Sequence, residues 1–372
     1  MDFATVVPPY VAKPLELHPF TAVMLAPSRV GDPASARALA RPYRDVASRL
    51  LQWIEQGRAV QDTAPALYLH EYTAAGLTIR GLVGALGISR RAETMAERAV
   101  WPHEAIHPEQ AGELADRMWQ MQLNPAPILL VHHGDQALRD LIAEVARAKP
   151  DWRYLDRTRQ RQRIWAIRDE DVLSRIGALL AGTSCLIADG HHRYAAYVRL
   201  QEEHPGTAWD AGLAMLVDQD DTPLFLGAIH RTLPGTTLDD LVEAARSAGA
   251  DVSVHERQHA LSALDSTHLV LTDGNTWHTV SPGDLAREAA VSWLHDHVLT
   301  RLPRPVERVE PHHNVDDALA ASSATSPAVL LPSPDFDQVR ALVESGGLLP
   351  EKATSFQPKP SLGVLMRPMS DG

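Results

Sequence analysis

The chain is organised around the stretch Cys185-Leu186-Ile187-Ala188-Asp189-Gly190-His191-His192-Arg193-Tyr194-Ala195-Ala196-Tyr197. A short apolar run ends at Asp-Gly, and apolar residues recur over 194–200 at the spacing of the inner face of a helix. The stretch therefore predicts a buried strand, a glycine turn and the start of a helix.

The expected turn places three cationic or potentially cationic side chains at a helix start. Asp189 is expected to cap the helix, and Gly190 allows a tight turn and the close approach of a ligand. His191, His192 and Arg193 then occupy the first helical turn, where free N–H groups favour an anion. Either a bound phosphate or carboxylate stabilises these side chains, or Arg193 pairs with a nearby carboxylate and the two histidines are structural.

Length and composition narrow the classes of protein. The 372 residues suggest two domains, and 45% hydrophobic with 22% charged residues is ordinary for a globular protein. A formal charge of −12 argues against general nucleic-acid binding but is compatible with a local basic pocket. No apolar run approaches the roughly 20 residues of a membrane helix and no signal pattern opens the chain, so a cytoplasmic location without membrane contact is expected. The single cysteine, Cys185, is expected to be a small buried hydrophobe.

The segment Asp189-Gly190-His191-His192-Arg193-Tyr194, called the signature below, resembles that of the DUF1015 family. It is also similar to the nucleotide loop of the ParB/sulfiredoxin superfamily, in which a Gly-x-x-Arg turn opens a helix. His191 stands where sulfiredoxin has its catalytic cysteine, which argues against sulfinic acid repair, whereas the ParB-like free-serine kinase shares Asp-Gly-His-His-Arg. The resemblance extends over about residues 17–366. It implies an α+β fold, with a ParB/sulfiredoxin-like nucleotide-binding core and a second α+β domain at the C-terminus.

Residues 1–235 are expected to form the N-terminal domain with the signature, and 236–372 the C-terminal domain ending in a lysine/proline motif. The hydrophobic periodicity and the turn residues predict the local elements. The expected strands are 17–25, a hairpin of 66–72 and 77–86, 128–131, 164–167, paired strands 212–218 and 224–230, 251–255, and a hairpin of 268–272 and 276–280. The expected helices are 33–56 with a break at Pro42, 109–123, 135–148, 169–180, 238–248, 285–299 and 315–321.

Glu104 is the candidate general base. It lies in Trp101-Pro102-His103-Glu104, which resembles the family's His-Glu-x-Thr motif, and the resemblance to ParB-like kinases implies that it takes the proton of a substrate hydroxyl. A carboxylate near a phosphate turn could equally hold Mg²⁺. A third interpretation makes Glu104 an acid favoured by the dipole of the following helix.

The end of the chain supplies two candidate lysines. Lys352 and Lys359 lie in a segment that resembles the family's terminal Met-Pro-x-Lys-Ser-Thr-x-Phe-x-Pro-Lys motif, although a solvated terminus is the ordinary alternative. Three histidines, His230, His312 and His313, stand at positions that also resemble the family pattern, and their roles stay open. A metal at the His312-His313 pair is discounted because adjacent side chains diverge.

Together these features predict a kinase that transfers a phosphoryl group from ATP or ADP, with Mg²⁺, to a small hydroxylated substrate such as serine. The resemblance implies that Arg193 binds phosphate and that His191 and His192 bond the same phosphate or place a metal. It also implies that Asp189 ligates Mg²⁺ or caps the turn, while Lys352 or Lys359 neutralises phosphoryl charge. The alternative is a nucleotide-responsive, non-catalytic module of the ParB-like type. The sequence does not distinguish among ATP, ADP and CTP. It also does not show whether the chain forms a homodimer.

Overall fold

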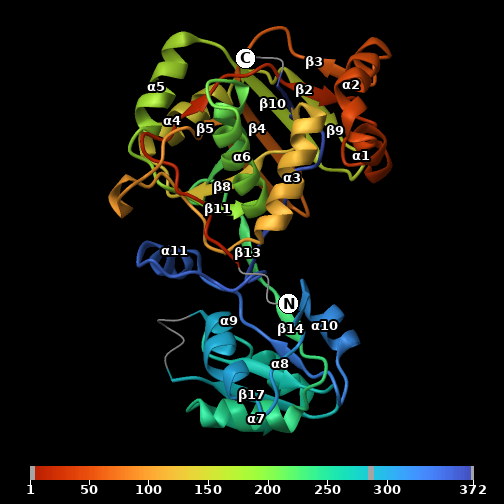
Figure 1. Cartoon of the computed structure of the whole chain (residues 1–372), viewed down its shortest axis with the longest axis vertical. Helices are drawn as coiled ribbons and strands as arrows, with labels where there is room; N and C mark the ends of the chain where they lie inside the picture. The colour runs from red at the N-terminus through yellow and green to blue at the C-terminus, as the bar shows by residue number, and fades with distance from the viewer. Residues whose placement is uncertain (1–4, 284–288, 370–372) are drawn as a thin grey trace. The chain divides into compact units, whose positions relative to one another are not determined.

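The computed structural model describes residues 5–283 and 289–369. Helices and strands mix throughout, which confirms the expected α+β class (Figure 1). The chain divides into two compact units: unit 1 comprises 1–224 and 358–372, and unit 2 comprises 225–357. The boundary expected after residue 235 differs from this division at both ends. Residues 225–235 belong to unit 2, and the last fifteen or so residues belong to unit 1.

Unit 1 is built on a nine-stranded mixed sheet. The strands follow the order β6-β11-β8-β12-β5-β4-β10-β9, and β1 also pairs with β5. Their bounds are β1 Leu17–His18, β4 Leu67–Ala74, β5 Leu77–Gly87, β6 Val100–Trp101, β8 Ile128–His132, β9 Trp152–Leu155, β10 Arg161–Ile167, β11 Cys185–Asp189 and β12 Ala211–Asp218. The expected hairpin is confirmed as β4 and β5, whereas the single strand expected over 17–25 is two strands, β1 and β2 (Val23–Leu25), the second of which pairs with β3 (Ala59–Gln61).

Several helix ends in unit 1 lie at the proline or aspartate that the sequence indicates. Pro42 separates α1 (Pro33–Ala40) from α2 (Val46–Glu55), and Pro108 is the first residue of α3 (Pro108–Met121). Asp135 caps α4 (Gln136–Val145), and Asp169 caps α5 (Glu170–Leu180). The signature helix is α6 (His191–Glu203), which packs beside α3 (Figure 1).

The strands expected to pair over 212–218 and 224–230 belong to different units. β12 is a central strand that pairs with both β5 and β8, so neither of its edges is open to another strand. β13 (Phe225–Ala228) instead pairs with β20 (Thr354–Gln357) in unit 2. The turn residues between these two strands connect unit 1 to unit 2 and do not form a hairpin. Because the sequence predicts that the two strands pair within one domain, the predicted boundary lies after residue 235 and not after Leu224.

The end of the chain returns to unit 1. The Tyr72 hydroxyl donates to the Pro358 carbonyl oxygen at 2.6 Å, and the Leu25 N–H donates to the Gly363 carbonyl oxygen at 2.8 Å. β21 (Arg367–Pro368) then pairs with β7 (Leu123–Asn124). Residues 358–369 are therefore part of the structure of unit 1.

Unit 2 contains a six-stranded sheet of order β15-β17-β16-β19-β14-β18. Its strands are β14 His230–Thr232, β15 Asp251–His255, β16 Leu269–Thr272, β17 Trp277–Ser281, β18 Glu310–His312 and β19 Ala328–Leu330. The expected hairpin is confirmed as β16 and β17. The helices are α7 Leu238–Ser247, α8 Arg257–Ala263, α9 Ala290–Trp293, α10 Val315–Ala321 and α11 Phe336–Glu344.

The helix expected over 285–299 begins outside the described residues, and its remainder is α9 followed by a π-helix, Leu294–Val298, and a 3-10 turn. Cys185 is buried, as expected. In the part of the chain that the structure describes, none of the helices has both the length and the apolar character needed to span a bilayer.

Candidate functional site

The signature forms a strand, a bulge and a left-handed glycine before α6. The pairing of β11 with β8 shifts register between Ile187 and Asp189, and Gly190 has φ +99°. A Cβ at residue 190 would lie 3.0 Å from both Arg193 Nη2 and Ile128 Cγ2, so both backbone conformation and space favour glycine. The expectation that Asp189 caps the helix is wrong. Gly190 occupies the N-cap position and α6 has no side-chain cap.

Asp189 instead lies between two cations. One carboxylate oxygen contacts Arg193 Nη2 and the other contacts Lys359 Nζ. Burial alone would raise the pKa of the Asp189 carboxyl, but the charges of Arg193 and Lys359 outweigh it, so this pKa is lowered. We call Asp189, Arg193 and Lys359 the Asp189 group. Of the two interpretations left open by the sequence, the structure shows the pairing of Arg193 with a nearby carboxylate.

Arg193 also fixes the backbone next to the turn. Its Nη1 donates to the Pro127 carbonyl oxygen at 2.6 Å, on the segment that leads into β8. Four residues on, the Tyr197 hydroxyl and the Ala126 carbonyl oxygen lie 3.3 Å apart. The guanidinium therefore joins the helix start, the acidic end of β11 and the beginning of β8.

The two candidate lysines lie in different units. Lys359 belongs to unit 1, and its side chain is about half-exposed beside Asp189. Lys352 belongs to unit 2 and has a positive φ of 56°. Its carbonyl oxygen and that of Glu351 accept hydrogen bonds from the buried Arg231, at 2.7 and 3.1 Å. Lys359 is thus the lysine that the structure brings to the signature.

Glu104 comes to the same end of the sheet through strand pairing. β6 runs parallel to β11, with Val100 opposite Cys185 and Trp101 opposite Leu186. The residues that follow the two strands therefore leave the sheet at one edge. This places residues 102–107, which we call the Glu104 segment, beside the signature turn. The Glu104 side chain is only 13% exposed, and its Oε1 lies 3.6 Å from Nε2 of the fully buried His103.

The two signature histidines contact the Glu104 segment. The backbone N–H of His103 donates to Nε2 of His191 at 3.3 Å, and the N–H of His107 donates to Nε2 of His192 at 3.2 Å. Burial is the main reason that the pKa of His191 falls to about 3. The sequence did not single out His103, although it precedes Glu104 in the quoted motif.

The family model described as "Protein of unknown function (DUF1015)" matches residues 9–305, which is more than half of the chain. The chain belongs to the DUF1015 family. No curated protein matches it.

Among solved structures, this DUF1015 protein is similar to SbnI with a C-terminal truncation from Staphylococcus aureus, at 12% identity over 73% of this chain and 85% of that one, with a TM-score of 0.43. It is also similar to a free serine kinase in complex with AMP, at 17% identity over 72% and 88%, with a TM-score of 0.39. A conserved hypothetical protein from Pyrococcus furiosus gives 14% identity over 74% and 94%, with a TM-score of 0.38. The family is shown by the family model, and its description leaves the reaction open.

The donor set of this DUF1015 protein does not fit a Mg²⁺ ion held by side chains. Within residues 5–283 and 289–369, no three His, Cys, Asp or Glu side chains are grouped so that they could hold a metal. Both carboxylate oxygens of Asp189, the expected ligand, contact cations. We therefore derive no step through Mg²⁺.

His230 and His312 take part in the sheet of unit 2. The N–H of Leu331 donates to Nδ1 of His230 at 3.1 Å, and burial lowers the pKa of His230 to about 4. Nε2 of His312 lies 2.8 Å from Oγ1 of Thr232 on the neighbouring strand. His230 and His312 are thus partners across the β14–β18 pair, and His230 also contacts the residue that follows β19. The structure assigns no role to His313.

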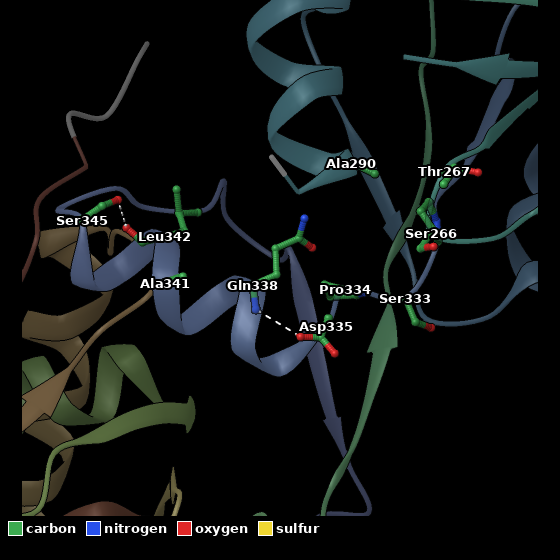
Figure 2. A pocket seen from close by; sticks show the side chains of 11 residues that line it. Ser266, Thr267, Ala290, Ser333, Pro334, Asp335, Gln338, Ala341, Leu342 and Ser345 are labelled. Atoms are coloured by element: carbon green, nitrogen blue, oxygen red, sulfur yellow. Dashed lines mark hydrogen bonds between the residues drawn. The ribbon is translucent and has the colours of Figure 1, made fainter. Parts of the chain in front are cut away.

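Unit 2 has a hollow of about 620 Å³ beside α11. Figure 2 shows the side chains that line it. Asp335, which caps α11, is the one formally charged residue among those lining it, and Gln338 is another polar lining residue. The lining therefore supplies a negative charge where the signature supplies positive ones, so this hollow does not match the chemistry of the signature. The Asp189 group and Glu104 remain the candidate site.

Proposed function

We propose that this protein is a nucleotide-dependent small-molecule kinase that transfers a phosphoryl group from ATP or ADP to the hydroxyl of serine or a serine-like metabolite. The observation that carries the proposal is the parallel pairing of β6 with β11, which brings the largely buried Glu104 carboxylate to the same sheet edge as a two-cation turn. The resemblance of the signature to that of ParB-like free-serine kinases supports it. The same resemblance supports a ParB/sulfiredoxin-like description of unit 1.

The turn has the chemistry of a phosphate receptor. The first N–H groups of α6 are not capped by a side chain, and Gly190 lets a ligand approach the backbone. Arg193 supplies a planar fork and Lys359 a point charge, both suited to phosphate oxygens. Asp189 contacts both cations, so an incoming phosphate competes with this carboxylate for them.

Glu104 is the proposed base. As the substrate hydroxyl oxygen forms its bond to the terminal phosphorus, the bond from that phosphorus to the bridging oxygen of the nucleotide breaks, and the hydroxyl proton passes to the Glu104 carboxylate. The nucleotide leaves with one phosphate fewer. Arg193 and Lys359 stabilise the charge on the phosphoryl oxygens during the transfer.

Calorimetric titration with ATP, ADP, CTP and GTP, with and without added Mg²⁺, tests the receptor. We expect saturable binding that is lost in Arg193→Ala. Because Arg193 also holds the Pro127 carbonyl oxygen, Lys359→Met serves as a second variant that removes a charge from a half-exposed side chain. Phosphorus NMR with L-serine and other hydroxy compounds then tests the transfer. Failure of every nucleotide to bind would exclude the kinase and any nucleotide-controlled module together.

One observation favours a second candidate, a nucleotide-responsive module that does not transfer phosphate. Asp189, which the resemblance makes a Mg²⁺ ligand, contacts a cation through each oxygen, so Mg²⁺ would have to compete with Arg193 and Lys359 for it. A nucleotide could then displace Asp189 from its cations and change the turn without reacting. Nucleotide turnover that depends on an added hydroxy compound supports the kinase, whereas binding without such turnover supports the module.

A further inference from the structure

We propose that His191 and His192 are positioning residues that clamp the Glu104 segment to the start of α6, and that neither binds the phosphate through Nε2. The clamp consists of two hydrogen bonds, from the His103 N–H to His191 and from the His107 N–H to His192. The clamp would hold Glu104 in place for proton transfer, and this part of the inference rests on the proposed function.

The clamp holds both ends of one short connection. β6 ends at Trp101 and α3 begins at Pro108, so residues 102–107 form the whole link between them. Two consecutive residues of α6 contact this link at His103 and at His107, on either side of Glu104. The backbone of Ile106 also pairs with that of Val6. A carboxylate on a connection held at these points has little freedom to move away from the turn.

Ring packing reinforces the two hydrogen bonds. The rings of His103 and His191 meet edge to face, with centroids 4.5 Å apart and planes at 88°. The rings of His107 and His192 lie nearly parallel, with centroids 6.2 Å apart. Each signature histidine therefore contacts the same residue twice, through its ring and through the partner's backbone N–H.

The two hydrogen bonds define the protonation state of the His191 and His192 rings. A ring nitrogen that accepts an N–H carries no proton, so His191 and His192 are neutral and bear their hydrogen on Nδ1. The groups that face His191 are His103, Glu104, Asp189 and His192, and burial in their midst keeps its pKa near 3. A phosphate bond through Nε2 would require His191 to release the buried His103 N–H.

The experiment compares two substitutions at each histidine with a matched control on the same helix. His191→Phe and His192→Phe keep an aromatic ring but remove the acceptor, whereas His191→Gln and His192→Gln place a carbonyl oxygen near the position of Nε2. His204→Phe is the control, because His204 ends α6 and its ring stacks on Trp119 with centroids 3.9 Å apart. The readouts are the nucleotide Kd and the kcat for phosphorylation of the hydroxy substrate.

We expect each Phe variant to lower kcat by about 10- to 100-fold, as a misplaced catalytic group does, and to change the nucleotide Kd by less than about threefold. The Gln variants should recover part of the lost kcat, and His204→Phe should match the unmodified protein. Nucleotide affinity that falls as far as kcat would show a phosphate contact and overturn the proposal. A Phe variant with unchanged kcat would overturn it as well.

A measurement on the unmodified protein keeps the test independent of activity and of variant folding. Hydrogen exchange with residue-level fragmentation should show the His103 and His107 amides exchanging at least about tenfold more slowly than in unstructured peptides. Exchange at unstructured rates would overturn the clamp even if the protein is a kinase. Protected amides in a protein that phosphorylates nothing would support the clamp while the proposed function fails.

Discussion

Two charged clusters of unit 1 lie near opposite ends of strand β8 and have opposite balances of charge. In the Asp189 group, one carboxylate contacts two cations. In the second cluster, which we call the Asp218 group, one cation contacts two carboxylates: Nη1 of Arg139 lies 3.1 Å from Asp218 and 3.4 Å from Asp220. The strand register separates them, since Asp189 is opposite Leu129 and Asp218 is opposite His132.

The difference shows why only one cluster is a candidate receptor. The Asp218 carboxylate also accepts the backbone N–H groups of Gly134 and Asp220, at 3.0 and 2.9 Å, so it closes the loops at that end of the sheet. Its guanidinium partner already has an excess of negative charge around it. The Asp189 group has one more cation than carboxylate, beside the uncapped N-terminus of α6, and an anion is the group that would balance it.

The largest difference between the two clusters is expected for Glu104, the proposed base beside the Asp189 group. Glu104→Gln should lower the rate of phosphoryl transfer by about 10²- to 10⁴-fold, because general base catalysis contributes that much, with little change in nucleotide Kd. Asp218→Asn is the control and should leave the rate of folded protein unchanged. Phosphorus NMR gives both rates. A Glu104→Gln protein as fast as the original would remove the base assignment.

Removing one cation from each cluster should affect nucleotide affinity in one case and stability in the other. Lys359→Met should raise the nucleotide Kd by about 10- to 100-fold, since a hydrogen bond between charged groups contributes about 1.5–3 kcal/mol. Arg139→Met should leave this Kd within about twofold and lower the free energy of unfolding instead. Calorimetry and urea denaturation measure the two effects. Equal loss of nucleotide affinity in both variants would mean that the charge balance does not identify the receptor.

As the pH falls, the buried His191 should reduce the free energy of unfolding at a higher pH than the Asp189 and Asp218 carboxylates do. The pKa of His191 is about 3 in the folded chain and about 6.5 when unfolded, so the unfolded state binds the proton first and stability falls as the pH drops below 6.5. His191 alone should lose about 2 kcal/mol between pH 7 and pH 5. Asp189 and Asp218 have lowered pKa values, so their contribution is lost only below about pH 4.

Urea denaturation at pH 7, 6 and 5 measures this effect. The buried His70 and His230 and the partly buried His295, whose pKa values burial lowers to about 4, should act in the same direction as His191. His191→Gln should therefore reduce the slope of stability against pH without abolishing it. A free energy of unfolding that is constant or rises between pH 7 and pH 5 would contradict the assignment of neutral buried histidines.

The smallest expected effect separates the roles of the two carboxylates. Asp189→Asn removes the competitor for Arg193 and Lys359, so inorganic phosphate measured without Mg²⁺ should bind a few times more tightly, by less than about 1 kcal/mol. Asp218→Asn should not change phosphate binding. Calorimetry with inorganic phosphate checks both variants. Weaker binding in Asp189→Asn would show that this carboxylate supports the anion site and does not compete with it.

Local features of the fold could be predicted from the sequence, whereas the contacts that assemble the site could not. Pro42, Pro108 and Asp135 mark helix ends through their own backbone and side-chain chemistry, and the structure confirms each of them. The pairing of β6 with β11 involves a strand of only two residues, too short to show a periodicity. The proximity of Lys359 to Asp189 joins residues far apart in sequence, for which local propensity carries no signal.

The expectation about Asp189 failed for an instructive reason. An aspartate before a helix is a common cap, but here Gly190 intervenes in a left-handed conformation and becomes the N-cap itself. The carboxylate then contacts cations from α6 and from the end of the chain. The sequence contained both Arg193 and Lys359 as candidates, but the geometry that joins them to Asp189 depends on the tertiary structure.

The return of residues 358–369 to unit 1 has a consequence for synthesis of the protein. A ribosome that adds about 5–20 residues per second needs roughly 7–27 s to cover the roughly 135 residues from Leu224 to Lys359. Throughout that interval the nascent unit 1 has its signature turn but lacks one of the two cations of the Asp189 group. The Asp189 group is therefore completed only after unit 2 has been translated, so a chain that stops early would carry Asp189 and Arg193 without Lys359.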